Sequence, residues 1–336
     1  MKDYCKIELV LKEQLEKDDP NTLFARYQQA RKYLFENIYP KIGESLPNFT
    51  YHDGSHAIDV LENISQLLDD NIDKITGETL YFLCLSALFH DVGLIYGRDD
   101  HQKKINDIYN DACGKESIQK IGNEKIIISK AVEAHSGKSM NNTNDTLEYL
   151  GELPGYSEPI NVMEIAAILR FADELAEGGQ RTSDYFLARN KYPKNSKIFH
   201  RYSQSYKSII SNKNNRLVIT YNIGLLLSNT NELLIDPDIK LKTFLDFIYQ
   251  RIIKLDDERK YCRYYCQWLD RMKEISIDFN FWYESERVEI GLPPLILSDK
   301  IIPGESGRKI EKLYSYSNID NILHENLKTF SKENVL

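Results

Sequence analysis

Cysteine is scarce in this sequence, and its spacing matches no common framework. The 336-residue chain has five cysteines, which are Cys5, Cys84, Cys113, Cys262 and Cys266. Small secreted domains that depend on disulfides are much denser in cysteine. The last two are four residues apart, one helical turn, whereas a zinc knuckle has C-x-x-C spacing and needs a second pair. We therefore expect neither a disulfide framework nor a cysteine zinc site.

Long apolar runs and an excess of positive charge are also missing. We find no apolar run of the roughly 18 residues that span a bilayer. The N-terminal MKDYCKIELVLKEQLEKDD has charges where a signal peptide needs an apolar segment, so we expect a cytoplasmic protein without a membrane partner. The chain has 43 Lys and Arg against 51 Asp and Glu, a net charge of −8. This balance is the opposite of what a duplex nucleic acid attracts, and we expect no such partner.

Hydrophobic residues, in contrast, are plentiful enough for a sizeable core. They make up 42% of the chain and charged residues 28%, as in ordinary globular proteins. At about 150 residues per domain, the length predicts about two domains. Up to about residue 190 the periodicity is helical: an apolar stripe follows residues 57–68, and residues 80–89 are apolar almost all round. We also expect helices over 21–41, 116–134 and 162–176, and a polar loop over 136–158.

The pattern changes after about residue 193. Residues 204–211 and 216–223 are typical of two strands around a turn, and residues 275–283 alternate with the period of a strand. A long helix is expected between them, from about 238 to 273. We predict a mainly α protein. It consists of an all-helical bundle over 1–192, a smaller α+β unit over 193–292 with a short antiparallel sheet of about three strands and the long helix, and a loosely held polar tail over 293–336.

Histidine and aspartate occupy buried positions of the predicted helices. His90 and Asp91 end the most apolar helix, Asp173 and His135 fall on apolar faces, and His56 begins the stripe along 57–68. A carboxylate buried in this way is costly unless something neutralises it. A single buried His or Asp is usually satisfied by a backbone hydrogen bond. Several on separate helices favour a shared divalent cation instead.

The residue types narrow the choice of cation. Carboxylates and imidazoles without thiolates favour Mn²⁺ and leave Mg²⁺, Fe²⁺, Co²⁺ and Ni²⁺ open, whereas a closed structural zinc is disfavoured. Four protein ligands on an octahedral ion leave about two positions for water and a phosphate oxygen. The pattern therefore predicts a hydrolytic metal site.

The order of these residues resembles the HD-domain metal-dependent phosphohydrolases. The matching pieces are FTYHDGSHAIDVL, LFHDVG, VEAHSG and LRFADELAEGGQRTSDYF, over about residues 45–190. The resemblance is greatest to the branch with a first motif H-D-x-S-H and a β hairpin and long helix after the HD domain. These later parts match YSQSYKSII, RLVITY and KTFLDFIYQRIIKLDDERKYCRYYC. The resemblance implies an all-helical catalytic domain with the metal ligands His56, His90, Asp91 and Asp173.

The activity that the resemblance implies is hydrolysis of phosphate esters, including nucleotides. A deoxynucleoside triphosphate is the first-choice substrate, and such hydrolases act in bacterial antiviral defence as well as in housekeeping. Leu94 stands where the triphosphohydrolase branch usually has a histidine and where cyclic-dinucleotide phosphodiesterases have a lysine, and their GYP signature is absent. Two alternatives stay open: a phosphodiesterase for a nucleotide second messenger or RNA ends, and a nucleotide-sensing module without chemistry.

Polar residues near the motifs are candidates for substrate contact and catalysis. Phosphate needs positive charge beyond the cation, and we single out His52, Asp53, Arg98, Lys104, Arg170 and Arg181 as candidate substrate-binding residues. A solvated surface is the alternative for the lysines. The candidate catalytic residues are Asp91, His101 and His135. For His135 we consider orienting the attacking water, protonating the leaving oxygen or joining a second metal, with a satisfied core histidine as the alternative.

The expected partners are a nucleotide substrate, a second copy of the chain and, as an open option, a regulatory nucleotide. The aromatic residues Tyr261, Tyr264, Tyr265 and Trp268 exceed what one small sheet can cover. This excess favours a homo-oligomer, and an internal core is the alternative.

Overall fold

The structure, a computed structural model, describes residues 3–18, 23–99, 101–114, 120–137, 143–300 and 313–333. It divides by contacts into two compact units. The first unit comprises Met1–Ala176 with Tyr261–Arg271, and the second comprises Glu177–Lys260 with Met272–Leu336. The domain boundaries that the sequence predicted, after residues 192 and 292, stay predictions.

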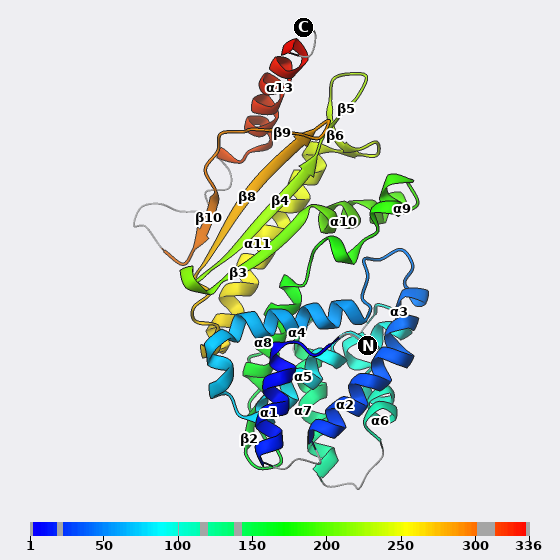
Figure 1. The fold of residues 1–336 in the computed structure, drawn as a ribbon, viewed down its shortest axis with the longest axis vertical. Helices are drawn as coiled ribbons and strands as arrows, with labels where there is room; N and C mark the ends of the chain where they lie inside the picture. The colour runs from blue at the N-terminus through cyan, green and yellow to red at the C-terminus, as the bar shows by residue number, and fades with distance from the viewer. Residues whose placement is uncertain are drawn as a thin grey trace. The chain divides into compact units, whose positions relative to one another are not determined.

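The first unit is mainly helical, as predicted (Figure 1). Its helices are α1 (Lys6–Asp18), α2 (Leu23–Tyr33), α3 (Tyr39–Ser45), α4 (Gly54–Leu68), α5 (Gly77–Phe89), α6 (Asn106–Cys113), α7 (Lys120–Ala134) and α8 (Val162–Leu175). Its shorter helical segments are the π-helix η1 (Leu34–Ile38) and the 3₁₀ helices η2 (Asp69–Lys74), η3 (Val92–Tyr96), η4 (His101–Lys103) and η7 (Gln267–Leu269). The helices predicted over 57–68, 80–89 and 162–176 are confirmed as α4, α5 and α8. The helix predicted over 21–41 is divided, in its described part, into α2, η1 and α3.

Helix α5 is the centre of this unit. Every residue from Leu80 to Phe89 is buried, and the helix contacts α1, α2, α7 and α8. By length and composition alone, Gly77–Tyr96 could cross a membrane, which corrects our expectation that no apolar run is long enough. However, 83% of that apolar window is buried inside the protein. A buried core helix meets the same criterion, so this is weak evidence for a membrane span.

Side-chain caps set where two of the site-bearing helices begin. The Asp53 carboxylate accepts a hydrogen bond from the Ser55 backbone N–H at 2.9 Å, so α4 begins just before His56. Asn161 caps α8 in the same way through the Glu164 N–H, at 3.2 Å. The loop predicted over 136–158 contains part of a hairpin, β1 (Glu152–Pro154) and β2 (Pro159–Asn161), so the first unit is not entirely helical.

The second unit is built on a mixed sheet. Its strands are β3 (Tyr206–Ser211), β4 (Arg216–Gly224), β8 (Glu274–Tyr283), β9 (Glu286–Val288) and β10 (Leu295–Ser298), in the order β10-β8-β4-β3 with β9 on β8. We expected a three-stranded antiparallel sheet, but β4 and β8 run parallel, with Arg216 opposite Glu274 and Gly224 opposite Trp282. Parallel neighbours need a crossover connection. Helix α11 (Leu241–Tyr265) lies in that connection and covers one face of the sheet (Figure 1).

Other elements surround this sheet. They are η5 (Gly179–Arg181), α9 (Asp184–Ala188), α10 (Lys194–Ser205), η6 (Asn212–Asn214), β5 (Leu226–Leu227), β6 (Leu233–Asp236), β7 (Ile239–Lys240) and α13 (Tyr316–Glu333). The residues predicted as a tail include β10, paired with β8, and α13. Ile319, Leu323 and Leu327 are buried along one side of α13. Their spacing of four residues is typical of an amphipathic helix, which our prediction of a loosely held polar tail did not include.

Candidate metal centre

The four predicted metal ligands converge in the first unit. His56 lies in the first turn of α4, His90 and Asp91 directly follow α5, and Asp173 lies near the end of α8. His56 Nε2 is 3.1 Å from Asp173 Oδ1 and 3.5 Å from Asp91 Oδ2. His90 Nε2 is 3.3 Å from Asp91 Oδ2, 3.6 Å from Asp173 Oδ1 and 3.2 Å from His56 Nε2. One ligand atom each from His56, His90 and Asp173 therefore lie within 4.8 Å of one another, and Asp91 Oδ2 lies within 3.5 Å of both histidine nitrogens.

These separations fit a divalent cation. Adjacent ligands around a first-row ion, at bond lengths of about 2.0–2.2 Å, lie about 3–3.5 Å apart. His56 and His90 are almost completely buried, and the Asp91 side chain is 9% exposed. The Asp173 side chain is 28% exposed, which leaves the cluster accessible from its side. The set consists of nitrogen and oxygen donors, as the sequence predicted.

The hydrogen bond of His90 gives the strongest reason to place a cation here. Its Nδ1–H donates to the Ala87 carbonyl at 2.8 Å, so in the neutral imidazole Nε2 carries a lone pair. That lone pair faces the oxygens of Asp91 and Asp173. Electron-rich atoms in such contact repel each other unless a proton or a cation lies between them. His56 Nδ1 is buried and has no hydrogen-bond partner among the described residues.

The electrostatics of the cluster are consistent with this interpretation. Burial works against a charged His90, but the carboxylates of Asp91 and Asp173 outweigh it and raise the His90 pKa to about 9. Burial also disfavours charge on Asp91, but the charges of His90 and His52 hold its pKa well below the usual range. For Asp173 the hydrogen bond with His56 and the charge of His90 outweigh burial and lower the pKa. The carboxylates stay charged and require positive charge between them.

A second group shares Asp91. Its other oxygen, Oδ1, is 3.3 Å from His101 Nε2, and His101 Nδ1–H donates to the Arg98 carbonyl at 3.1 Å. His135 Nδ1–H likewise donates to the Val132 carbonyl, and its ring centre is 5.9 Å from that of His101. One ligand atom each from Asp91, His101 and His135 lie within 4.8 Å of one another, so this group could also hold a metal ion.

His135 remains neutral in this setting. Burial and the positive charge of His90 disfavour its protonated form and lower its pKa to about 4. Because Nδ1 carries the proton that is donated to Val132, Nε2 offers a lone pair. That nitrogen can accept a hydrogen bond from water or ligate a cation.

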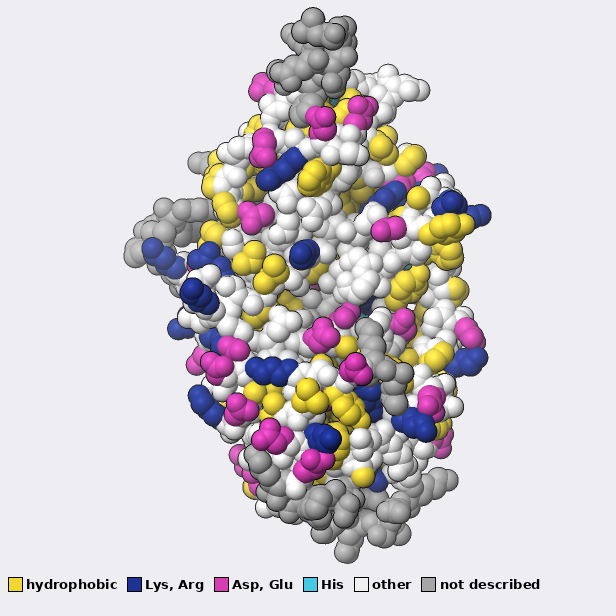
Figure 2. All heavy atoms as spheres, viewed as in Figure 1, with side chains coloured by type: hydrophobic (Ala, Val, Ile, Leu, Met, Phe, Trp, Pro, Cys, Tyr) yellow, Lys and Arg dark blue, Asp and Glu magenta, His cyan; other side chains and the backbone are white. Residues whose placement is uncertain are grey.

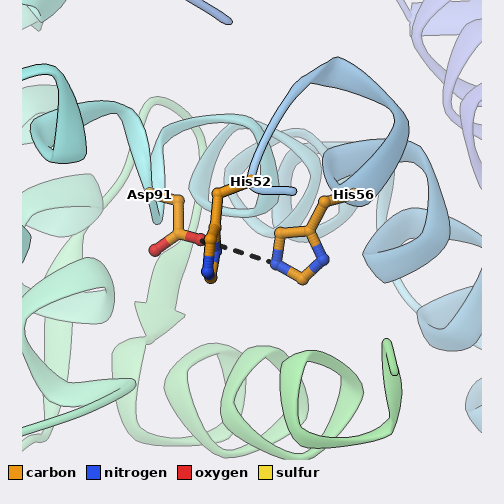
Figure 3. Close-up of side chains that lie close together, drawn as sticks. All are labelled: His52, His56 and Asp91. Atoms are coloured by element: carbon orange, nitrogen blue, oxygen red, sulfur yellow. Dashed lines mark hydrogen bonds and ion pairs between the residues drawn. The ribbon is translucent and has the colours of Figure 1, made fainter. Parts of the chain in front are cut away.

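His52 contacts the same carboxylate from the residues before α4. Its Nδ1 is 2.9 Å from Asp91 Oδ2, and its ring meets the His56 ring edge-on at 5.4 Å between centres. Figure 3 shows the Asp91 carboxylate pointing toward both imidazoles. His52, His56 and Asp91 form a third group with ligand atoms within 4.8 Å. A hydrogen bond to a ligating carboxylate orients it and tunes its affinity.

A glycine lets His101 approach Asp91. A Cβ on Gly93 would lie 1.9 Å from the His101 carbonyl oxygen, so only glycine fits where η3 meets η4. Gly93 is the glycine of the H-D-x-G segment in LFHDVG. This close contact is a structural reason for that glycine.

Comparison with known families agrees with the geometry. The model of the HD-CE family matches residues 46–253, more than half of the chain. The chain belongs to the HD-CE family. This family is related to the HD domain, and together with the buried His/Asp groups it suggests a metal-dependent phosphohydrolase with a divalent metal. No curated protein matches the sequence significantly.

The candidate substrate-binding residues of this HD-CE chain make separate local contacts with neighbouring groups. Asp53 caps α4, as described above, and the Arg98 guanidinium lies 5.0 Å from the centre of the Phe49 ring. Lys104 follows η4 directly, and its backbone N–H donates to the His101 carbonyl at 3.0 Å. Arg170 Nη1 donates to Thr146 Oγ1 at 3.0 Å.

Arg181 belongs to the second unit, where it lies 3.4 Å from Glu177. The structure therefore brings the predicted histidines and aspartates together, whereas Asp53, Arg98 and Arg170 are engaged by neighbouring side chains or backbone. The assignment of Asp53, Arg98, Lys104, Arg170 and Arg181 to substrate binding remains a prediction.

Two residues near His135, Thr146 and Tyr261, were not predicted from the sequence as functional residues. Thr146 donates a hydrogen bond to the Ala134 carbonyl, next to His135, and Tyr261 contacts the loop that contains Thr146. Thr146 lies in a polar stretch, and Tyr261 is more than 100 residues further along the chain. Nothing in the local sequence distinguishes either residue from its neighbours.

Proposed function

We propose that this protein hydrolyses a phosphate ester bond of a nucleotide in a metal-dependent reaction. The observation that carries the proposal is the convergence of His56, His90, Asp91 and Asp173, with the lone pair of His90 Nε2 facing two carboxylates. Membership of the HD-CE family supports the same class of reaction.

The chain's own residues have distinct roles in this proposal. His56, His90, Asp91 and Asp173 would hold the divalent cation, with Mn²⁺ as the first choice. Such a cation, when bound, supplies Lewis acidity to a phosphoryl oxygen and lowers the pKa of water. His135 Nε2 accepts a hydrogen bond from the attacking water and thereby orients it.

His101 is the proposed proton donor to the leaving oxygen. Its side chain is 16% exposed, whereas His135 is almost fully buried, so His101 can exchange protons with solvent more readily. Its Nε2 lies 3.3 Å from Asp91 Oδ1. In this proposal His135 orients the attacking water, and His101 protonates the leaving oxygen.

A deoxynucleoside triphosphate is the proposed substrate, on the strength of the resemblance described above. Acidic and basic side chains are interspersed over the face shown in Figure 2. An interspersed surface of this kind suits a small anion that is captured locally rather than a long polyanion. Arg98 and Lys104, on either side of His101, are the proposed source of the local positive charge.

The test is a panel of nucleotides incubated with the Mn²⁺-loaded full-length protein. Water added at the 5′ phosphoester of a deoxynucleoside triphosphate yields a deoxynucleoside and triphosphate, and these are the expected products. Release of a monophosphate from a cyclic or linear dinucleotide would support the phosphodiesterase instead. Tight nucleotide binding without turnover in any divalent metal would overturn the proposed hydrolase in favour of a sensing module.

A further inference from the structure

The turn that presents His135 is held from outside helix α7. Thr146 Oγ1 donates a hydrogen bond to the Ala134 carbonyl at 2.6 Å. Arg170 Nη1 donates to Thr146 Oγ1 at 3.0 Å and to the same carbonyl at 3.4 Å. Ala134 is the last residue of α7, and His135 follows it directly. These bonds therefore restrain the backbone from which the His135 imidazole extends.

Two tyrosines in the last turn of α11 contact Arg170 and the residues next to Thr146. The Arg170 guanidinium lies 5.0 Å from the centre of the Tyr261 ring. The Tyr261 hydroxyl donates to Asp145 Oδ1 at 2.8 Å and accepts from the Leu147 N–H at 3.0 Å. The Tyr265 hydroxyl donates to the other oxygen of Asp145 at 2.9 Å. Tyr261 therefore bonds the residues on both sides of Thr146, and Tyr265 bonds Asp145 a second time.

The chain reaches this place by way of α11. Helix α11 spans Leu241–Tyr265; its residues up to Lys260 belong to the second unit, and Tyr261–Arg271 pack with the first. Arg271 anchors the end of this segment independently, through Asp69 at 3.0 Å and the Leu68 carbonyl at 2.9 Å. Loss of a tyrosine hydroxyl therefore leaves the segment attached.

We propose that Thr146, Arg170, Tyr261 and Tyr265 are positioning residues for His135. They touch no reacting atom, but they set the imidazole against the water that it orients, so turnover depends on a segment supplied by the C-terminal half of the chain. This inference rests on the proposed function and deepens it. A displacement of a catalytic group by about 1 Å can lower a rate by about 100-fold. We expect about a tenfold loss when one bond of the brace is removed.

The first experiment compares two changes at one position. Thr146→Val keeps the shape of threonine without its hydroxyl, whereas Thr146→Ser keeps the hydroxyl. Thr146→Val is expected to lower kcat on the nucleotide panel about tenfold, with KM and bound Mn²⁺ unchanged, and Thr146→Ser should restore wild-type turnover. Equal loss in both variants, or loss of metal in parallel with activity, would overturn the proposal.

A readout independent of activity separates this inference from the proposed function. In full-length protein with isotope-labelled histidine, the His135 imidazole signals are identified by their absence in His135→Ala. They should shift or broaden in Thr146→Val and stay in place in Thr146→Ser. This comparison can be made even if no nucleotide is hydrolysed, in which case only the proposed function fails. Unmoved His135 signals in Thr146→Val would overturn the positioning role.

The second experiment tests the tyrosines against a matched control. Tyr264 lies in the same turn of α11 and is 83% exposed. The double change Tyr261→Phe/Tyr265→Phe should lower kcat about as much as Thr146→Val and move the His135 signals, while Tyr264→Phe should do neither. A double variant that behaves like wild type would remove α11 from the proposal. The same loss in Tyr264→Phe would overturn any specific role of the two hydroxyls.

Discussion

Two clusters of charged and ionisable side chains, one in each unit, differ in how their carboxylates are satisfied. In the second unit, Lys197 Nζ lies 3.0 Å from Asp236 and 2.5 Å from Asp238, and Arg201 Nη2 lies 2.7 Å from Asp236. Each of these carboxylates has a cationic partner that is charged at any physiological pH. The cluster is complete without a ligand.

At the candidate metal centre, in the described part of the first unit, the partners of Asp91 and Asp173 are histidines rather than lysine or arginine. Asp91 and Asp173 are approached by imidazoles, and the hydrogen bond from His90 to Ala87 turns a lone pair toward the carboxylates. Burial alone therefore does not distinguish a functional cluster from a structural one. The two clusters differ in the partners of their carboxylates. Carboxylates paired with lysine or arginine stabilise a fold, whereas carboxylate oxygens and imidazole nitrogens that converge on one another favour a bound cation.

The largest expected effect comes from removing a metal ligand. Asp173→Ala should release the bound metal and lower hydrolysis by at least about 100-fold, because both depend on the four-ligand set. The measurements are metal content and turnover on the nucleotide panel, with circular dichroism to confirm the fold. The double change His90→Ala/Asp91→Ala should act in the same way. If either variant kept both metal and activity, the assigned centre would be wrong.

In the second unit, we expect a substitution to lower stability and to leave metal content unchanged. Lys197 is 1% exposed, and Lys197→Met leaves Asp236 and Asp238 short of positive charge. This change should lower the free energy of unfolding by about 3 kcal/mol, measured by urea denaturation. Metal content of the folded protein should not change. As a matched control, the exposed Lys194 also pairs with Asp238, at 2.9 Å, and Lys194→Met should cost less than about 1 kcal/mol.

His52 lies between the two cases, because it contacts the predicted ligand Asp91 and is not one of the four predicted ligands. His52→Ala removes its hydrogen bond to Asp91 and should weaken metal affinity by about 10- to 100-fold. Isothermal titration with Mn²⁺ measures this, and the apoprotein should unfold at nearly the same urea concentration. Complete loss of metal would instead make His52 a ligand.

A smaller loss of activity is expected when a substitution displaces His101 without removing a functional side chain. Gly93→Ala inserts a methyl group against the His101 carbonyl, so it should displace His101 and lower kcat about tenfold while the metal is retained. Gly43→Ala is the control, since nothing lies within 4 Å of its added Cβ. Wild-type kcat in Gly93→Ala would show that the position of His101 does not matter to the reaction.

The smallest effect is a pH dependence in the second unit. Burial opposes charge on Asp236, but hydrogen bonds from Arg201 and Lys197 outweigh it and lower its pKa; bonds from Lys197 and Lys194 lower the pKa of Asp238. Stability from these pairs is present above the unfolded pKa of about 3.9 and is lost as the pH falls through the lower folded values. Urea midpoints between pH 7 and pH 3 should fall less steeply in Asp236→Asn than in wild type. Equal slopes would contradict this assignment.

Much of the first unit was predictable because helical periodicity is a local property. The stripe from Ala57 to Leu68 and the apolar segment Leu80–Phe89 depend on neighbours three and four residues away. The mixed sheet was not predictable in this way. The pairing of β4 with β8 joins strands more than 50 residues apart, and their order depends on which faces α11 can cover.

By itself, the sequence determined which residue types are present, their helical setting and their order along the chain. These sufficed to predict which histidines and aspartates would come together as a candidate metal site. Only the tertiary structure decided that Asp91 divides its two oxygens between His90 and His101, and that Tyr261 reaches the loop beside His135 from 114 residues away at Leu147. The physical reason is that a hydrogen bond needs atoms within about 3 Å, whereas sequence spacing specifies distances only within a few turns of one helix.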